Sequence, residues 1–178
     1  MGNCGGLKII FIIFARNFYT ETTMRFLGNI EARIDAKGRA FLPACFRKEL
    51  QTGGEENIIM RRDVFQNCLV LYPESVWCAQ MDLLREKLNR WNGKEQMLFR
   101  QFVSDVEILA LDTNGRILIP ARYRKLTGIN QDVRFVGMGD VIEVWSPENL
   151  DKVMLEQQQF AGELEDMMSA LSDDRHKD

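Results

Sequence analysis

Two short segments of the chain carry an aspartate and an arginine at the same spacing, Asp35 with Arg39 and Asp112 with Arg116. The fifteen-residue stretches around them are offset by 77 positions and are identical at seven of those positions. General acid–base catalysis needs a group that exchanges its proton near the working pH, and a carboxylate facing an arginine is held charged. The duplicated Asp–Arg motif therefore favours a structural or binding role over an enzymatic one.

Other catalytic chemistry has little support in the composition. The one histidine, His176, lies in the polar C-terminal tail, which makes a Ser-His-Asp triad or a multi-histidine metal site improbable. No Cys-x-x-Cys pair, a spacing typical of metal sites, occurs among the four cysteines, which are Cys4, Cys45, Cys68 and Cys78. Cys45 and Cys68 have apolar neighbours, as buried free thiols do in a reducing compartment. We expect no enzymatic activity, no metal and no cofactor.

Charge is distributed unevenly along the chain. The 178 residues are 46% hydrophobic and 28% charged, with a net charge of −3, which is the composition of a globular protein. Residues 24–62 carry a net charge of +3, whereas residues 148–178 carry −6. Arg33, Lys37 and Arg39 flank one turn, and a basic two-stranded ribbon can enter a DNA groove. Charge alone leaves two interpretations open, a nucleic-acid interface and a merely solvated turn held by a structural Asp–Arg pair.

The repeated motif predicts a tight turn in each copy. An aspartate at the start of a turn accepts bonds from following N–H groups, and the glycine three residues later, Gly38 or Gly115, supplies an unusual backbone conformation. Strand-like runs at 30–34 and 106–111 precede the turns, and we expect them to form hairpins with the runs at 39–42 and 116–119. Pro43 and Pro120 end those strands. The segments expected to follow are helices at 44–50 and 121–126, then strand pairs at 57–60 with 68–71 and at 132–137 with 140–144.

Helices are predicted between and after the two copies. Apolar residues at helical spacing form one stripe, which comprises Trp77, Met81, Leu84, Leu88 and Trp91. Asn92 and Gly93 end that helix, and a second one is expected at 95–103. Ser146 and Pro147 are a typical helix start, which predicts one helix over 147–160. Beyond residue 162 the chain is acidic, and we expect this tail to be mobile.

Residues 1–23 match neither copy. The apolar run at 9–14 is too short to cross a bilayer, which takes about 20 apolar residues. We expect residues 1–23 to be an extension outside the fold, with no membrane partner. The remaining organisation is α+β, with a first unit at 29–76, a helical connector at 77–104, a second unit at 105–148, and a C-terminal helix and acidic tail at 149–178. Units of this size bury little alone, so they are expected to pack together or across subunits.

Residues 24–168 resemble the MraZ family, bacterial regulators associated with the division and cell-wall gene cluster. The resemblance rests on the start Met24-Arg25-Phe26-Leu27-Gly28, the paired Asp-x-x-x-Arg motifs, and the segments Leu42-Pro43-Ala44 and Ile119-Pro120-Ala121. It implies two tandem SpoVT/AbrB-like swapped-hairpin units, each a double-split β-barrel. It also implies sequence-specific binding to double-stranded promoter repeats upstream of that cluster, usually repressing transcription, by ring-shaped homo-oligomers in the cytoplasm at the nucleoid.

Carried over to this chain, the resemblance makes Arg39 and Arg116 the principal DNA-contacting residues. Arg33 and Lys37 are secondary candidates from their position. Asp35 and Asp112, with Gly38 and Gly115, would hold the turns. In the second copy Thr113 and Asn114 stand where the first has Ala36 and Lys37, so that turn carries less charge.

Two other classes remain as alternatives. An AbrB-like antitoxin or protein-interaction module would neutralise a partner through its tail, and a separate toxin gene beside its own would favour it. The helix expected at 147–160 argues against such a disordered tail. An enzyme acting on a small-molecule substrate is the least supported, since each aspartate faces an arginine rather than a second acid.

Overall fold

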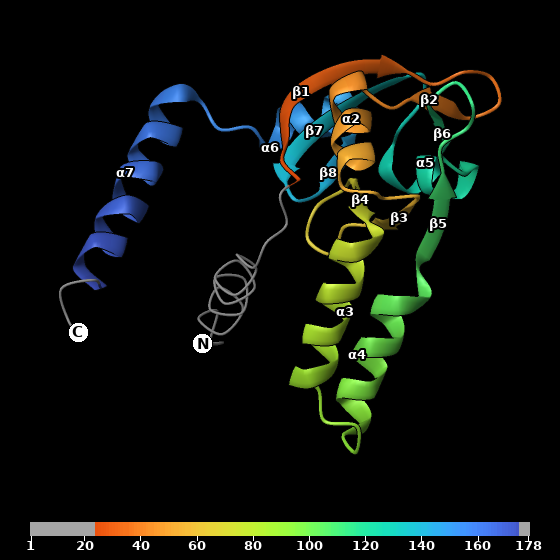
Figure 1. Ribbon diagram of the computed structural model, residues 1–178. Helices are drawn as coiled ribbons and strands as arrows, with labels where there is room; N and C mark the ends of the chain where they lie inside the picture. Colours follow the sequence, from red (N-terminus) through yellow and green to blue (C-terminus); the bar gives the residue numbers. More distant parts are fainter. Residues whose placement is uncertain (1–23, 175–178) are drawn as a thin grey trace.

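The computed structural model describes residues 24–174, with side chains described as far as residue 169. The expectation for residues 1–23 lies outside the described part of the chain. The elements, in chain order, are β1 (Phe26–Arg33), β2 (Arg39–Phe41), α2 (Ala44–Thr52), β3 (Asn57–Arg62), β4 (Leu69–Pro73), α3 (Glu74–Lys87), α4 (Gly93–Ser104), β5 (Val106–Ala110), β6 (Arg116–Leu118), α5 (Ala121–Thr127), β7 (Asp132–Gly139), β8 (Ile142–Trp145), α6 (Pro147–Val153) and α7 (Gln157–Asp174). Figure 1 shows a sheet-containing body from which α3, α4 and α7 project. The expected α+β class is therefore observed.

The strands of the two repeats interleave in one sheet. Its order is β1-β7-β8-β4-β3-β5, with every neighbouring pair antiparallel. The first strand of the first repeat, β1, pairs with β7 of the second repeat over eight residues. Reciprocally, β5 of the second repeat pairs with β3 of the first. The two repeats have thus exchanged their first strands, while the expected pairs β3 with β4 and β7 with β8 are confirmed.

The expected hairpins across the Asp–Arg turns are wrong in their pairing. Between β1 and β2 only a single bridge forms, from Ile34 to Ala40. Instead β2 pairs with β6 as a separate two-stranded ribbon. β2 and β6 have three residues each, and one residue separates the end of each strand from a proline. Such short strands cannot cover the long first strands, which find a full-length partner in the other repeat.

One core serves both repeats. It includes Phe26 and Phe46 from the first repeat, whose rings meet edge to face with centroids 5.6 Å apart. Ile117 and Tyr123 from the second repeat are equally buried in the same cluster. Burial of each such side chain contributes about 1.5–3 kcal/mol. The apolar surface that stabilises either repeat is therefore supplied partly by the other.

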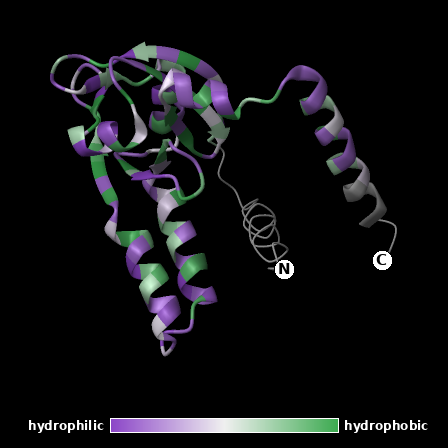
Figure 2. Ribbon diagram, turned by 180° about the vertical axis from the view of Figure 1, so that it is seen from behind, coloured by the Kyte–Doolittle hydropathy of each residue, from purple (hydrophilic) through white to green (hydrophobic). Residues whose placement is uncertain are grey.

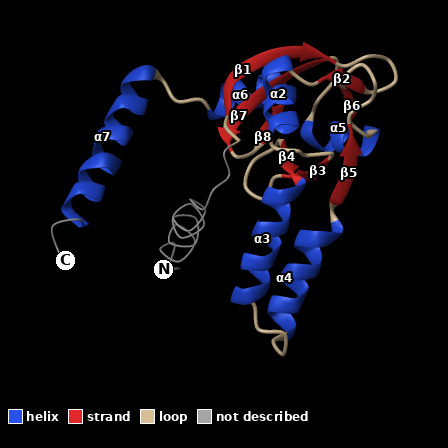
Figure 3. Ribbon diagram, viewed as in Figure 1, coloured by secondary structure: helices blue, strands red, loops and turns tan. Residues whose placement is uncertain are grey.

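The connector is a helix pair, and its predicted stripe is only partly correct. The helix α3 ends at Lys87, so Leu88 and Trp91 lie beyond it, and Trp91 is 96% exposed. The second helix, expected at 95–103, begins two residues earlier because the side chain of Asn92 accepts hydrogen bonds from the N–H groups of Lys94 and Glu95. In Figure 3 the two helices lie side by side and extend away from the strands.

Aromatic contacts anchor this helix pair to the sheet. The rings of Trp77 in α3 and Phe102 in α4 are stacked with centroids 5.5 Å apart. The guanidinium of Arg61, a buried residue of β3, lies 3.9 Å from the centroid of the Phe102 ring. Burial lowers the pKa of Arg61. The cation–π contact offsets part of the cost of placing this cation inside the protein.

The C-terminal region differs from its prediction. The expected helix over 147–160 is divided into α6 and α7, separated by Met154, Leu155 and Glu156. The tail expected to be mobile is helical as far as Asp174. No glycine or proline marks the break, whereas Gly162 lies inside α7, where glycine costs only about 1 kcal/mol relative to alanine. Local propensity therefore indicated neither the break after Val153 nor the continuation of α7 to Asp174.

Two cysteines of the repeats differ in their burial. Cys68 is buried, and burial raises the pKa of its thiol, whereas Cys45 is exposed on α2, contrary to the expectation of burial. Within residues 24–174 no helix has the length and apolar character needed to span a membrane. The described side chains include no grouping of His, Cys, Asp or Glu that could hold a metal ion.

Candidate nucleic-acid interface

The two Asp–Arg turns have the same geometry. In the first, Asp35 Oδ1 accepts hydrogen bonds from the N–H groups of Lys37 and Arg39 at 2.9 and 3.0 Å. The N–H of Gly38 donates to the carbonyl of Asp35 at 2.9 Å, with Gly38 at a φ of +85°. The second turn repeats these bonds, with Asp112 Oδ1 accepting at 2.9 Å from the N–H groups of Asn114 and Arg116. The sequence repeat thus encodes one local structure twice.

Each turn also orients its arginine. Arg39 donates through Nε to Asp35 Oδ2 at 2.8 Å, and its Nη2 lies 2.7 Å from the same oxygen. Arg116 donates through Nε to Asp112 Oδ2 at 2.7 Å. The arginine side chains nevertheless stay 30% and 20% exposed. Because each guanidinium has five N–H donors, both arginines keep donors available for a further acceptor.

The ribbon β2–β6 brings the two turns together. Arg39 pairs with Leu118, Ala40 with Ile117 and Phe41 with Arg116. Ala40 and Ile117 are fully buried, so strand alternation turns the arginines, Phe41 and Leu118 to the other face. Phe41 and Leu118 are 55% and 50% exposed. The outer face of the ribbon therefore carries two arginines and two apolar side chains, and we call these four residues the ribbon face.

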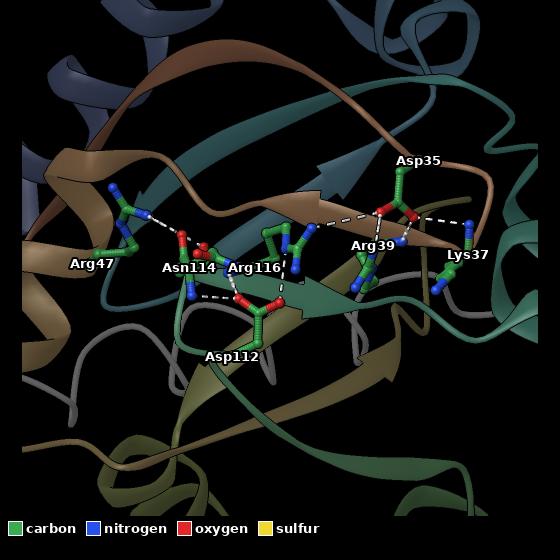
Figure 4. A network of polar contacts seen from close by, with 8 residues as sticks. Asp35, Lys37, Arg39, Arg47, Asp112, Asn114 and Arg116 are labelled. Carbon is green, nitrogen blue, oxygen red and sulfur yellow. Dashed lines mark hydrogen bonds and ion pairs between the residues drawn. The ribbon is translucent and has the colours of Figure 1, made fainter.

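Contacts between the two turns make the site a joint product of both repeats. The N–H of Leu42 donates to the carbonyl of Gly115 at 3.1 Å, and that of Ile119 donates to Gly38 at 2.9 Å. The Nη1 of Arg116 lies 3.9 Å from Asp35 Oδ2, so Asp35 contacts both motif arginines, as Figure 4 shows. Neither turn can take up this arrangement without the other.

Two further arginines contact the turns from the helices. Arg47 of α2 reaches into the second turn, where its Nη1 donates to the carbonyls of Asn114 and Gly115 at 3.3 and 3.5 Å. Arg124 of α5 donates to the carbonyl of Ile119 at 3.2 Å and lies over Gly38 of the first turn. Neither arginine was predicted as a site residue from the sequence. Their signal was present, since Arg47 and Arg124 are equivalent positions of the repeat and are identical in both copies.

The remaining predicted residues lie at the edges of this arrangement. Lys37 is exposed on the first turn, where Asn114 occupies the equivalent position of the second. Arg33 at the end of β1 has an 86% exposed side chain and donates to Asp132 at 3.1 Å. This ion pair joins the ends of β1 and β7 and does not involve the residues that connect the two turns.

Electrostatics hold both aspartates in the charged form. The side-chain hydrogen bond from Arg39 is the largest cause that lowers the pKa of Asp35 to about 2. The backbone hydrogen bond from Arg116 is the main cause that lowers the pKa of Asp112. Both carboxylates are therefore ionised at neutral pH and orient their arginines. This arrangement suits binding to an anion and offers no acid or base for catalysis.

Comparison with known proteins matches this chain along both repeats. A family model described as "MraZ protein, putative antitoxin-like" matches residues 25–101 and 103–169. A protein of Phocaeicola vulgatus named transcriptional regulator MraZ is 61% identical over 145 residues, covering 82% of this chain and 94% of the relative. The chain belongs to the MraZ family. The protein of that name from Bacteroides fragilis is 58% identical over 145 residues, which are 82% of this chain and 92% of the relative.

A more distant relative extends the similarity across the MraZ family. The transcriptional regulator MraZ of Flavobacterium psychrophilum is 31% identical over 151 residues, or 84% of this chain and 96% of the relative. The two matched segments of the family model each contain one Asp–Arg motif. In this member of the MraZ family, the segments that match twice in sequence are thus those that exchange strands and share the ribbon.

Proposed function

We propose that this protein is a transcriptional regulator that binds double-stranded DNA sequence-specifically through the ribbon face. The observation that carries the proposal is the duplicated, outward-facing Asp–Arg pair on β2 and β6. A two-stranded ribbon fits the major groove, where arginine donates to O6 and N7 of guanine. A guanidinium already oriented by a carboxylate loses less conformational freedom when it binds.

The names of the relatives support a role in transcriptional regulation. Relatives up to 61% identical are named transcriptional regulators. In line with the family resemblance, we propose repression at promoter repeats upstream of the division and cell-wall gene cluster, in the cytoplasm at the nucleoid. The exchange of first strands between two repeats is consistent with a pair of AbrB-like swapped-hairpin units forming a double-split barrel.

Assembly into a ring-shaped homo-oligomer is part of this proposal. Large apolar side chains are exposed on the projecting parts of the molecule, among them Trp91 in the loop between α3 and α4, Met97 on α4 and Phe160 on α7. Contacts between copies would remove such surface from water. A ring that carries many ribbon faces would bind several promoter repeats at once and gain affinity through effective concentration.

The decisive experiment compares Arg39→Ala with a charge-matched control. Arg100→Ala removes the same charge from α4, which projects away from the ribbon. Binding is measured by fluorescence anisotropy on DNA from upstream of the gene and on a scrambled duplex. We expect Arg39→Ala to lose at least about fivefold in specific affinity, since one base-edge contact is worth about 1–3 kcal/mol. Arg100→Ala is expected to bind like the wild type.

The salt dependence adds an independent measure. The logarithmic slope of the binding constant is expected to be about −0.9 per neutralised phosphate. Arg116→Ala is expected to weaken binding less than Arg39→Ala, because Asn114 replaces Lys37 beside it. If Arg39→Ala bound the specific duplex as tightly as the wild type, the ribbon face would not be the DNA interface.

One observation favours a second candidate function, that of an antitoxin-like interaction module. The description of the matching family model includes the words antitoxin-like. This function requires a toxin encoded next to the gene. Co-expression of that neighbour with and without this protein would show rescue of growth if the antitoxin function were correct.

A further inference from the structure

The helix α7 carries an apolar stripe that its own chain leaves exposed. Phe160, Leu164, Met167 and Met168 recur at helical spacing on one side and are 41–55% exposed. Figure 1 shows α7 standing apart from the body, joined to α6 by a short extended segment. In Figure 2 hydrophilic and hydrophobic segments alternate along this helix. A helix with one apolar face is stabilised mainly by packing that face against another surface.

The charge of α7 defines the kind of surface that can cover it. Residues 157–174 contain five acidic residues and no basic ones. Glu163 and Glu165 adjoin Leu164 in the sequence and border the apolar stripe on its two sides. A complementary surface must therefore be apolar at its centre and basic at its edges.

The outer part of the α3–α4 pair has these properties. An open hollow between the helices is lined by Arg85, Leu88, Arg90, Gln96 and Phe99. Residues 85–96 carry four basic and two acidic groups. Within the described residues, Arg85 and Arg90 form no ion pair with a carboxylate. At the centre of the hollow lie the apolar side chains of Leu88 and Phe99, which are both partly exposed.

We propose that α7 of one copy binds between α3 and α4 of a second copy of this chain. The apolar stripe of α7 would cover Leu88 and Phe99, while its bordering glutamates would pair with Arg85 and Arg90. This inference rests on the proposed assembly and names its contact. We call the stripe of α7 the donor surface and the hollow between α3 and α4 the acceptor surface. Because the two surfaces differ, each copy offers one of each. Such heterologous contacts generate closed rings when the rotation from one copy to the next closes on itself.

The test uses two full-length variants, each lacking one surface. Leu164→Asp/Met167→Asp removes the donor stripe, and Arg85→Glu/Arg90→Glu reverses the acceptor charge. Masses are measured by sedimentation velocity over a range of concentrations. Each variant alone is expected to dissociate at concentrations at least about tenfold higher than the wild type does. Gln158→Asp/Gln159→Asp, at two positions of α7 outside the stripe, adds the same two charges and is expected to assemble normally.

Mixing the variants gives the sharpest result. An equimolar mixture has one intact donor and one intact acceptor per pair, so it is expected to form a dimer of one copy of each and to stop there. Binding of α7 to the hairpin of its own chain would give no such dimer and would overturn the proposal. Circular dichroism and urea unfolding check that each variant is folded.

A charge swap keeps the proposal testable if a variant fails to fold. Glu163→Lys/Glu165→Lys is expected to lose assembly alone and to regain it when combined with Arg85→Glu/Arg90→Glu. Absence of rescue would overturn the pairing. If the wild type assembles but the stripe variant keeps the same mass, only this inference fails. A monomeric wild type would refute the proposed assembly as well, and the Arg39 experiment would still decide DNA binding.

Discussion

Asp35 is the residue at which the two repeats meet. Its carboxylate accepts from its own turn, binds Arg39, and lies 3.9 Å from Arg116 of the other repeat. Asp112 has the corresponding contacts within its own turn. The side chain of Asp35 is 35% exposed, so solvent screens part of these interactions. The carboxylate thus acts as a local organiser of both arginines.

Acid is expected to weaken the fold through this residue. Because the pKa of Asp35 falls from 3.8 to about 2 on folding, its contribution to stability is complete above pH 4 and is lost as the pH falls through about 2. Urea unfolding of the wild type and Asp35→Asn between pH 2 and 7 measures this. The difference in free energy of unfolding between the two proteins should shrink as the pH is lowered from 7 to 2. A difference independent of pH would show that the carboxylate charge does not stabilise the turn.

At the scale of elements, the turns depend on glycine for two separate reasons. Gly38 and Gly139 have the same φ of +85°, which disfavours any other residue. A Cβ on Gly38 would also lie 3.2 Å from the carbonyl oxygen of Ile119, whereas one on Gly139 would meet nothing within 4 Å. The pair therefore separates backbone strain from crowding between the repeats.

Gly38→Ala is expected to destabilise the protein more than Gly139→Ala does. Gly139→Ala should cost about 1 kcal/mol from its positive φ alone. Gly38→Ala should exceed that value, because the added methyl presses on the backbone of Ile119 in the other repeat. Urea unfolding at neutral pH provides both values. Equal losses would mean that the backbone around the ribbon relaxes freely.

At the scale of the whole molecule, exchange of strands makes the repeats inseparable. Each repeat lends its first strand to the other, and both contribute to one core. The exposed loop that joins α3 to α4, near residue 92, is a natural place to divide the chain. Each half would then lack the strand of the other repeat with which its first strand pairs.

Fragments 24–92 and 93–178 are therefore expected to be unfolded alone and to fold when mixed. In isolation, the eight residues of β1 have no β7 to pair with, and β5 has no β3. Circular dichroism and amide NMR dispersion of each fragment and of the equimolar mixture test this. Cooperative unfolding of either isolated fragment would show that a repeat is a domain by itself.

The sequence by itself determined the local features. Asp35, Gly38 and Pro43, and their equivalents 77 residues later, specified both turns and the ends of the short strands, because these preferences act within a few residues. The motif arginines were selected as candidate DNA contacts from the resemblance to the MraZ family, and their role in DNA binding stays a prediction. The break between α6 and α7 had no such local signal, since no glycine or proline occurs there.

Only the tertiary structure decided which strands pair. The two copies are so alike that the alternating apolar and charged residues of a strand such as 30–34 match a partner in either repeat equally well. The choice depends on the total length paired and the surface buried, which are non-local quantities. The eight-residue ladder of β1 with β7 surpasses anything that the three-residue β2 could offer. The same exchange released β2 to pair with β6 and so placed Arg39 and Arg116 on one face.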